Sequence, residues 1–360
     1  MKKLCVRVLP VLATLLLVQG CANTAALRRP EERPLLVLRN DRIVVGLLPA
    51  VGGRIVLLRR PGGENVLKAD PALWGLPAGS HPTPGIEGGW RPYWGQIVWV
   101  GPQSAWWTEQ DVDPVRKQKK SDWPPDPYLV YGSFGIAERR ADYVRLEGPV
   151  SPISGVQLTK EVRIDRDGRV RFSVTARNTR AAVLQRDLWP NARMDGFSRV
   201  YVPVAAASDV RVSGPKPGHP KRVQMAHAVT DGFFTFTPAA PPAGKLWRTA
   251  KAYVQPSRGL LAGFSARDLF LIQFALVDRA QVHPDQGHVE LYNHARREGD
   301  RVESLLELET HGPLEELEPG AGMTLEQTWR VIEYTGPCNA QAHVHFLNAV
   351  LATGVARDFE

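Results

Sequence analysis

The densest group of residues suited to ligand chemistry is an aromatic cluster between positions 90 and 123, which holds six of the ten tryptophans in the chain. An indole ring can stack on the apolar C–H face of a sugar, while arginines, amides and acids bind its hydroxyl groups. The cluster therefore predicts a carbohydrate site that includes Trp90, Arg91, Trp94, Trp106 and Trp107. The alternative is that most of these indoles belong to the core, because tryptophan is heavily buried on average.

Two later segments add polar side chains of the same kind. The segment DLWPNARMD offers Trp189, Asn191 and Arg193 to a carbohydrate, or alternatively forms a salt-bridged turn. The segment VHPDQGHVELYNH offers Asn293 to the sugar and places His288 and Glu290 on one strand face, since alternate residues of a strand share a face. Histidine and carboxylate can transfer protons or bind a metal, but the spacing matches no strong metal motif. We therefore expect no metal and no other cofactor.

Other motifs of catalysis are absent from the sequence. It contains no Gly-x-Ser-x-Gly elbow, phosphate-binding loop, HExxH or dinucleotide fingerprint. The formal net charge is +8, but basic residues alternate with acidic ones along the chain. Because there is no basic stripe with interleaved aromatics, we expect no nucleic-acid partner.

The amino terminus predicts export and a lipid anchor. Lys2 and Lys3 precede an apolar run over 8–18, which is too short to span a bilayer as a stable helix. The following Val-Gln-Gly-Cys at 18–21 resembles the bacterial lipobox, in which Cys21 is lipidated and becomes the new terminus; the alternative is an ordinary secretory signal. Residue 22 is Ala rather than Asp, which favours the outer membrane over the inner one. We expect a signal peptide over 1–20, a tether over 21–34 and a periplasm-facing protein of the cell envelope, held at the membrane through the lipid on Cys21.

The remaining sequence is typical of antiparallel β-structure. Residues 156–164 and 169–177 alternate apolar and polar on either side of an Asp-Gly turn, which predicts a hairpin. Similar patterns predict further strands at 35–38, 42–48, 54–58, 128–134, 199–204, 232–237, 269–277, 301–309 and 323–334. We expect one β-sandwich domain over 35–335 and a tail over 336–360 that contains a helix near 339–351. After the first twenty residues and Cys21, only Cys338 remains, so we expect no internal disulfide.

Several segments resemble the galactose mutarotase-like β-sandwich family. They are LLPAVGGRIVLLRRPGGENVL at 47–67, RFSVTARNT at 171–179, VELYNH at 289–294 and LLELETHGPLEELEPGAGMTLEQTWRV at 305–331. The segments SDWPPDPY at 121–128 and SPISGVQLTKEV at 151–162 resemble one branch of that family, DUF4380. The resemblance implies an all-β, antiparallel, two-layer supersandwich whose concave face often holds a carbohydrate.

The resemblance also frames the question of catalysis. True aldose epimerases open the sugar ring with a histidine acid and a glutamate base, which must face each other across the ring. Their histidine motif has no counterpart here, so the candidates are chosen by residue type: His227, His288, Glu290 and Glu109. The main hypothesis is a lipid-anchored envelope protein that binds carbohydrate, without assured catalysis. The alternatives are a sugar epimerase or polysaccharide-processing enzyme on the same scaffold, and a non-catalytic protein-interaction module. The sequence does not indicate an oligomeric state.

Overall fold

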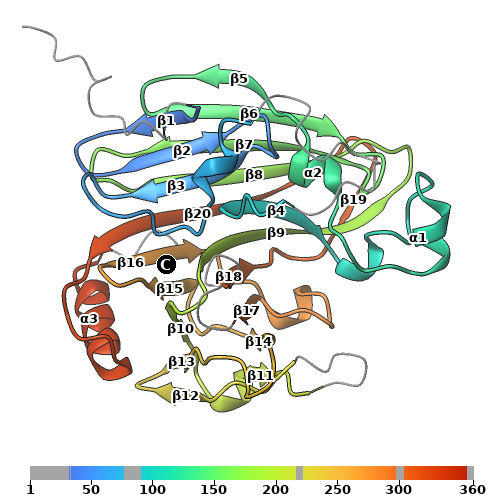
Figure 1. Cartoon of the computed structure of the whole chain (residues 1–360). Coiled ribbons are helices and arrows are strands. Elements are labelled where there is room, and N and C mark those ends of the chain that lie inside the picture. Colours follow the sequence, from blue (N-terminus) through green and yellow to red (C-terminus); the bar gives the residue numbers. More distant parts are fainter. Residues whose placement is uncertain (1–31, 33, 77–90, 216–221, 297–303, 355–360) are drawn as a thin grey trace, which may run out of the picture.

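Two ten-stranded antiparallel sheets make up the described part of the chain in the computed structural model (Figure 1). The structure describes residues 32, 34–76, 91–215, 222–296 and 304–354. The first sheet has the order β1-β2-β3-β4-β9-β18-β17-β14-β11, with β19 paired to β9, and the second has the order β12-β13-β10-β15-β16-β20-β8-β7-β6-β5.

The strands of the first sheet are β1 (Leu36–Arg39), β2 (Val44–Leu48), β3 (Arg54–Arg59), β4 (Gln96–Gly101), β9 (Leu184–Asp195), β11 (Val210–Val212), β14 (Trp247–Val254), β17 (Val289–Arg296), β18 (Leu305–Thr310) and β19 (Glu315–Leu317). Those of the second sheet are β5 (Gly135–Arg139), β6 (Tyr143–Val150), β7 (Val156–Ile164), β8 (Val170–Asn178), β10 (Arg199–Pro203), β12 (His227–Thr230), β13 (Phe233–Phe236), β15 (Leu260–Phe264), β16 (Asp268–Phe274) and β20 (Gly322–Glu333). Within these residues the α-helices are α1 (Pro114–Gln118), α2 (Pro127–Tyr131) and α3 (Ala340–Ala352).

The predicted hairpin is formed by β7 and β8, which pair in register from Val156 with Asn178 to Ile164 with Val170. Every second residue of β7 is buried and those between are half-buried. The connecting turn ends at Gly168, whose φ of 86° lies in the region that favours glycine. Alternation of side chains thus gives this hairpin one face for the core and one for solvent.

The main hydrophobic core lies between the two sheets. It combines residues such as Val98, Leu188 and Leu306 of the first sheet with Phe172 and Phe270 of the second. Burial of this apolar surface is the principal favourable term in folding. The all-β, two-layer antiparallel architecture predicted from the sequence is therefore confirmed.

One predicted strand is wrong. Residues 128–134 were expected to be extended, but 127–131 form the short helix α2. Asp126 caps it by accepting a hydrogen bond from the backbone N–H of Tyr128 at 2.9 Å, and Pro127 occupies the first turn. An Asp-Pro pair is a helix-start signal, and here it outweighs the apolar run that follows.

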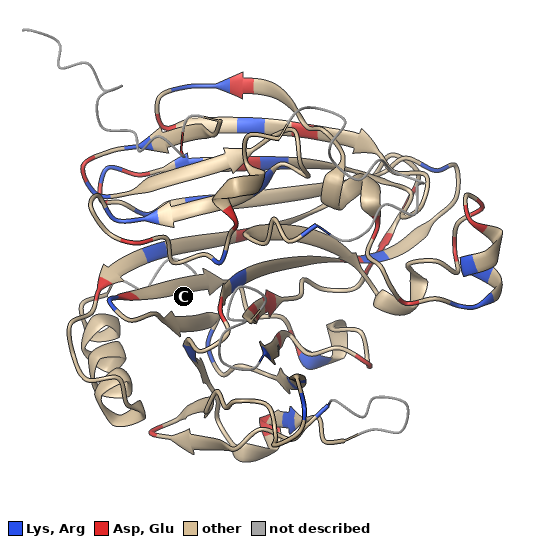
Figure 2. Cartoon of the chain, in the orientation of Figure 1, with Lys and Arg blue, Asp and Glu red and all other residues tan. Residues whose placement is uncertain are grey.

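The C-terminal helix is confirmed as α3, which packs on the outer face of the second sheet. Val344 and Leu347 of the helix join Phe264 and Leu271 in a separate apolar cluster. Among the described residues, no helix is long and apolar enough to cross a membrane. The expected signal peptide and Cys21 lie outside the described residues. Figure 2 shows basic and acidic residues interspersed over both sheets and the connecting loops.

Candidate functional site

Polar and aromatic side chains cover the outer face of the first sheet over β9, β18, β17 and β14, opposite the main core. In β9 the apolar residues Leu188, Ala192 and Met194 enter that core, so the residues between them point the other way. The same alternation applies to β14, β17 and β18. The outward-pointing set is Asp187, Trp189, Asn191 and Arg193 of β9, Glu307 and Glu309 of β18, Glu290, Tyr292 and His294 of β17, and Lys251 and Tyr253 of β14.

The strand register brings these residues together in rows. Glu309 lies opposite both Asn191 and Glu290, and Glu290 in turn lies opposite Tyr253. Directly opposed residues of antiparallel strands have Cβ atoms about 4.5–5.5 Å apart. Residues more than a hundred positions apart in the chain therefore form one continuous polar surface.

A cavity of about 500 Å³ opens on this surface. Its walls are formed by Trp94, Trp99, Gln103, Asp122, Trp123, Trp189, Arg222, Lys251, Tyr253, Tyr292, His294, Leu305 and Glu307. Ligand pockets in proteins measure about 300–1,000 Å³ and combine aromatic walls with a few polar groups. The cavity has that size and that composition.

Four of its walls are tryptophans. Trp99 of β4 and Trp189 of β9 meet edge to face, with their ring centroids 4.8 Å apart. Trp123 lies edge-on to Trp99 at 6.4 Å and keeps 51% of its surface exposed. The position of Trp94 is fixed partly by Arg54, whose guanidinium donates a hydrogen bond to the Trp94 carbonyl oxygen at 3.0 Å.

Behind the wall formed by Trp189 and Lys251 lies a buried ionic cluster. The ammonium group of Lys251 forms an ion pair with Glu290 and lies 3.6 Å from Oε2 of Glu309. The same Oε2 accepts a hydrogen bond from the indole N–H of Trp189 at 2.8 Å. The cavity wall and the buried carboxylates are therefore directly connected.

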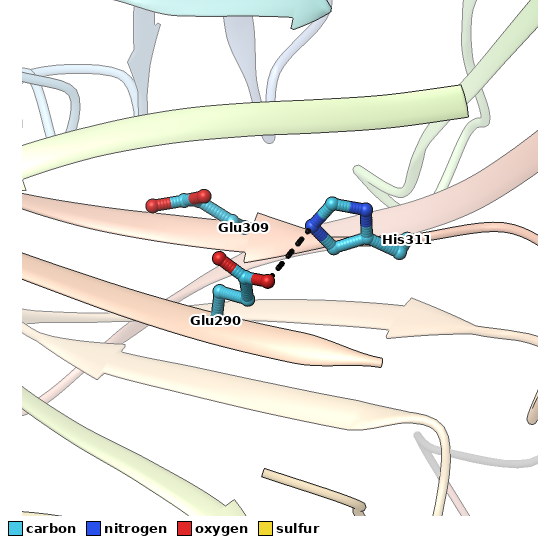
Figure 3. Close-up of side chains that lie close together, drawn as sticks. All are labelled: Glu290, Glu309 and His311. Carbon is cyan, nitrogen blue, oxygen red and sulfur yellow. Dashed lines mark ion pairs between the residues drawn. The ribbon is translucent and has the colours of Figure 1, made fainter. Parts of the chain in front are cut away.

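His311, immediately after β18, is the histidine of this cluster (Figure 3). Its Nδ1 is 2.7 Å from Oδ2 of Asp187, and its Nε2 is 3.6 Å from Oε1 of Glu290. His311 also lines a second cavity of about 180 Å³, together with His288 and Thr310. A carboxylate on one ring nitrogen fixes the orientation of the ring and directs the other nitrogen at Glu290.

Burial and neighbouring charges shift the pKa values of Glu290 and Glu309 in opposite directions. Burial raises the pKa of Glu309 well above its usual range, and Lys251 offsets only part of that rise. Burial also acts against ionised Glu290, but Lys251 and His311 outweigh it and lower the pKa of Glu290. Burial disfavours the Lys251 ammonium, yet the charges of Glu290 and Glu309 prevail and raise its pKa. The cluster thus holds a charged Lys251–Glu290 pair beside a Glu309 that tends to keep its proton.

A second ion pair borders the cavity. Nε of Arg193 donates to Oε1 of Glu307 at 2.7 Å, and the guanidinium lies 5.4 Å from the centre of the Trp99 ring. Glu307 is one of the cavity walls. The pair therefore presents a fixed carboxylate to any ligand in the cavity.

The residues predicted to bind carbohydrate are distributed unevenly. Trp94 and Trp189 line the cavity, whereas Asn191 and Arg193 are buried on the same sheet face next to it. Trp106 and Trp107 are buried and donate their indole N–H groups to the carbonyl oxygens of Val100 and Pro124. Asn293 points to the core side and donates to the carbonyl oxygens of Gly196 and Leu305. Arg91 is exposed and does not line the cavity, and Trp90 lies outside the described residues.

The four candidate catalytic residues do not meet. Glu290 belongs to the buried cluster, whereas His288 is buried against Phe274, and burial lowers the pKa of His288 to about 4. Glu109 is half exposed and forms an ion pair with Arg186 at 2.7 Å. His227 is exposed on β12, the edge strand of the second sheet. The structure therefore pairs Glu290 with His311 rather than with His227 or His288.

Sequence reasoning missed Asp187, Lys251, Glu309 and His311. A local signal existed for two of them, because Glu307, Glu309 and His311 alternate with Leu306 and Leu308 in LLELETH. That alternation predicts a strand with one polar face. It does not predict that the polar face is buried, which depends on the strands beside it.

Comparisons with known proteins agree with this architecture. The family model described as "Domain of unknown function (DUF4380)" matches residues 34–332. No match was found among curated proteins.

Solved structures of several proteins are similar to the chain. A galactose mutarotase-like protein from Lactobacillus casei has a TM-score of 0.51 and 11% sequence identity, and the match covers 83% of this chain and all of that one (100%). A TPR-domain containing protein from Parabacteroides distasonis has a TM-score of 0.50 and 15% identity, covering 84% of this chain and 48% of that one. A galactose 1-epimerase from Lactobacillus acidophilus has a TM-score of 0.47 and 11% identity, covering 84% and 95%. At such identities, the first two matches show a shared fold alone. The DUF4380 family predicted from the sequence is confirmed by the family model.

Proposed function

This chain belongs to the DUF4380 family and has a galactose mutarotase-like fold, and from that premise we propose that it binds a carbohydrate in the tryptophan-lined cavity of the first sheet. The observation that carries the proposal is the combination of indole walls and fixed polar groups in one cavity of about 500 Å³. Trp123, which is 51% exposed, offers a ring surface for the C–H face of a sugar, and Trp99 and Trp189 line the same cavity as largely buried rings.

The polar walls suit the hydroxyl groups of the same ligand. Glu307, held by Arg193, accepts hydrogen bonds, and the hydroxyl groups of Tyr253 and Tyr292 can donate or accept. A cavity of this kind favours a sugar ligand over a protein partner, which would need a broad flat patch.

Binding is tested with the full chain, purified in mild detergent, on a glycan array and then by calorimetry with the best ligand. We expect saturable binding of one saccharide class, and Glu307→Gln to weaken it because a neutral amide is a poorer acceptor. Thr175→Ala, on the half-buried outer face of β8 and outside the cavity, is the control. Absence of any glycan ligand for the folded protein would contradict the proposal.

A second candidate function, sugar epimerisation, is favoured by the separation of 3.6 Å between Nε2 of His311 and Oε1 of Glu290. One histidine and one carboxylate are the groups that ring opening requires. However, both are buried behind the cavity wall rather than in it. Binding without catalysis therefore fits the geometry better. The optical rotation of freshly dissolved aldoses tests this candidate: a rate above that of buffer, lost in His311→Gln, would support it.

We also propose that the protein is a lipoprotein of the bacterial envelope, facing the periplasm and anchored through Cys21, with the outer membrane favoured. The sequence of residues 1–22 supports this proposal. Labelling with radioactive palmitate and membrane fractionation test it. We expect Cys21→Ser to abolish labelling and release the protein from the membrane fraction. Labelling that survives the substitution would contradict it.

A further inference from the structure

We propose that Glu290, Glu309 and His311 form a binding site for a divalent transition-metal ion, located behind the sugar cavity. Each residue offers one ligand atom, and these atoms lie within 4.8 Å of one another (Figure 3). Bonds of about 2.0–2.2 Å to a central ion would require ligand atoms somewhat closer than this. A small rotation of the flexible glutamate side chains would provide the difference.

Two of the three ligand atoms have no hydrogen-bond partner. Among the described residues, neither Nε2 of His311 nor Oε1 of Glu309 forms a hydrogen bond, although both side chains are fully buried. Asn191, opposite Glu309 in the sheet, is also buried with both side-chain polar atoms unbonded. Buried polar atoms are nearly always satisfied, so three unsatisfied side chains at one point indicate a missing ligand.

The surrounding contacts orient the three side chains as an outer shell does in metal sites. Asp187 holds Nδ1 of His311 at 2.7 Å, which leaves Nε2 as the free nitrogen. Trp189 donates to Oε2 of Glu309, and the backbone N–H of Gly287 donates to Oε1 of Glu290 at 3.0 Å. Carboxylate–histidine–metal arrangements of this kind fix the ring and raise its basicity.

Lys251 does not occupy the proposed ligand atoms of the two glutamates. Its ammonium group contacts the Oε2 atoms of both glutamates. The Oε1 atoms can therefore coordinate an ion. A carboxylate oxygen has two lone pairs, and Oε1 of Glu290 uses only one of them for the hydrogen bond from Gly287.

The charges of the cluster also favour a cation. Asp187, Glu290 and Glu309 bring three buried carboxyl groups together, and Lys251 is the only amine or guanidinium that contacts them within the described part of the chain. Ionised carboxylates are costly to bury without compensation. A divalent ion together with Lys251 would balance all three negative charges.

The donor set points to a first-row transition metal. Imidazole favours zinc, copper, iron and nickel, whereas all-oxygen sites are typical of magnesium and calcium. Three protein ligands with an open position are typical of reactive rather than structural zinc sites. The cavity of about 180 Å³ that His311 lines lies beside the proposed site.

Zn²⁺ alone is the probe for the test. The full chain in detergent is stripped with a chelator and titrated with Zn²⁺ by calorimetry, without sugar. We expect one ion per chain, with affinity at least about 100-fold lower in Glu309→Gln and in His311→Gln, and about 10–100-fold lower in Asp187→Asn. Thermal unfolding of each metal-free variant shows whether it is folded. One folded variant, either Glu309→Gln or His311→Gln, is enough to test the proposal.

His288→Asn is the matched control, because His288 is buried, lines the same small cavity and is not a proposed ligand. It should bind Zn²⁺ as the wild type does. No binding by the wild-type chain, or equal binding by the wild type and a folded ligand variant, would overturn the proposal. Neither outcome affects the sugar site, which is measured separately on the metal-free protein.

Discussion

Two lysines, one in each sheet, are removed from solvent in opposite surroundings. Lys251 of β14 is 12% exposed and contacts two carboxylates, which raise its pKa against the effect of burial. Lys160 of β7 is 1% exposed and donates to the carbonyl oxygen of Gly52 at 2.7 Å, beside the ring of Phe134. Burial, with a smaller contribution from Arg54, lowers the pKa of Lys160 to about 7.

The different surroundings of the two lysines distinguish the polar outer face of the first sheet from the core side of the second. Around Lys251 the buried carboxylates keep the ammonium group charged. They also outnumber it, so one lysine cannot neutralise all of them. Around Lys160 the neighbours are the Phe134 ring and the Arg54 guanidinium rather than carboxylates, so the lysine acts chiefly as a hydrogen-bond donor to the Gly-Gly turn of residues 52 and 53. Substitutions at the two positions should therefore have opposite consequences.

The largest expected effect is that of Lys251→Met. It leaves Glu290 buried without its cation, and breaking a buried ion pair in this way costs about 3–5 kcal/mol. Lys160→Met removes a buried charge that has no carboxylate partner, so it should be neutral or stabilising. Urea unfolding at pH 7 measures both. Similar losses in the two variants would remove the contrast between the regions.

The next largest effect concerns pH. Because the folded-state pKa of Lys160 is about 7 and the reference value is 10.5, the unfolded chain holds the extra proton between these values. The free energy of unfolding should therefore rise with pH through this window, by up to a few kcal/mol, and the full penalty applies below pH 7. Urea unfolding of the wild type and of Lys160→Met at pH 7 and pH 9.5 tests this. Equal pH slopes in the two proteins would show that Lys160 is not desolvated.

A finer contrast lies within the cluster. Glu290→Gln removes the charged partner of Lys251 and should cost about 2–3 kcal/mol, since a buried ion then lacks its counter-charge. Glu309→Gln replaces a group that tends to be protonated, so it should cost less than about 1 kcal/mol. Thermal and urea unfolding of metal-free protein at pH 7 compare the two. The reverse order of stability would assign the proton to Glu290.

The smallest effect is expected at the cavity rim. Trp123→Ala should weaken sugar binding about tenfold, equivalent to about 1.4 kcal/mol, because it removes an indole face from the wall. Its stability should change little, since half of this side chain is exposed. Leu246→Ala is the control, because Leu246 is 72% exposed and lies outside the cavity. Calorimetry with the array-selected sugar measures both, and an unchanged affinity in Trp123→Ala would place the sugar elsewhere.

Much of the fold could be predicted from local sequence. Alternation over 156–164 and 169–177 predicts the β7–β8 hairpin because one face of each strand packs on the core and the other faces water. The spacing of apolar residues near 339–351 likewise predicts α3. The strand expected at 128–134 failed because Asp126 and Pro127 start a helix, and capping is decided by a few atoms rather than by average hydrophobicity.

The candidate site was less predictable. Trp94, Trp189 and Glu290 were selected by residue type, and the structure places them in or beside one site. The same criterion selected Trp106, Trp107 and Asn293, whose polar groups bond to backbone carbonyl oxygens instead. Residue type shows what a side chain can do, but it does not show whether a local hydrogen bond already uses it.

The sequence alone determined the β7–β8 hairpin, most of the other predicted strands and which residues of those strands share a face, because these depend on neighbours a few positions away. Only the tertiary structure decided that Lys251, Glu290 and Glu309 meet, and that Asp187 reaches His311. They come from four strands or strand ends whose order and register are fixed by packing across the whole core. Such contacts are long-range, so no local pattern in the chain encodes them.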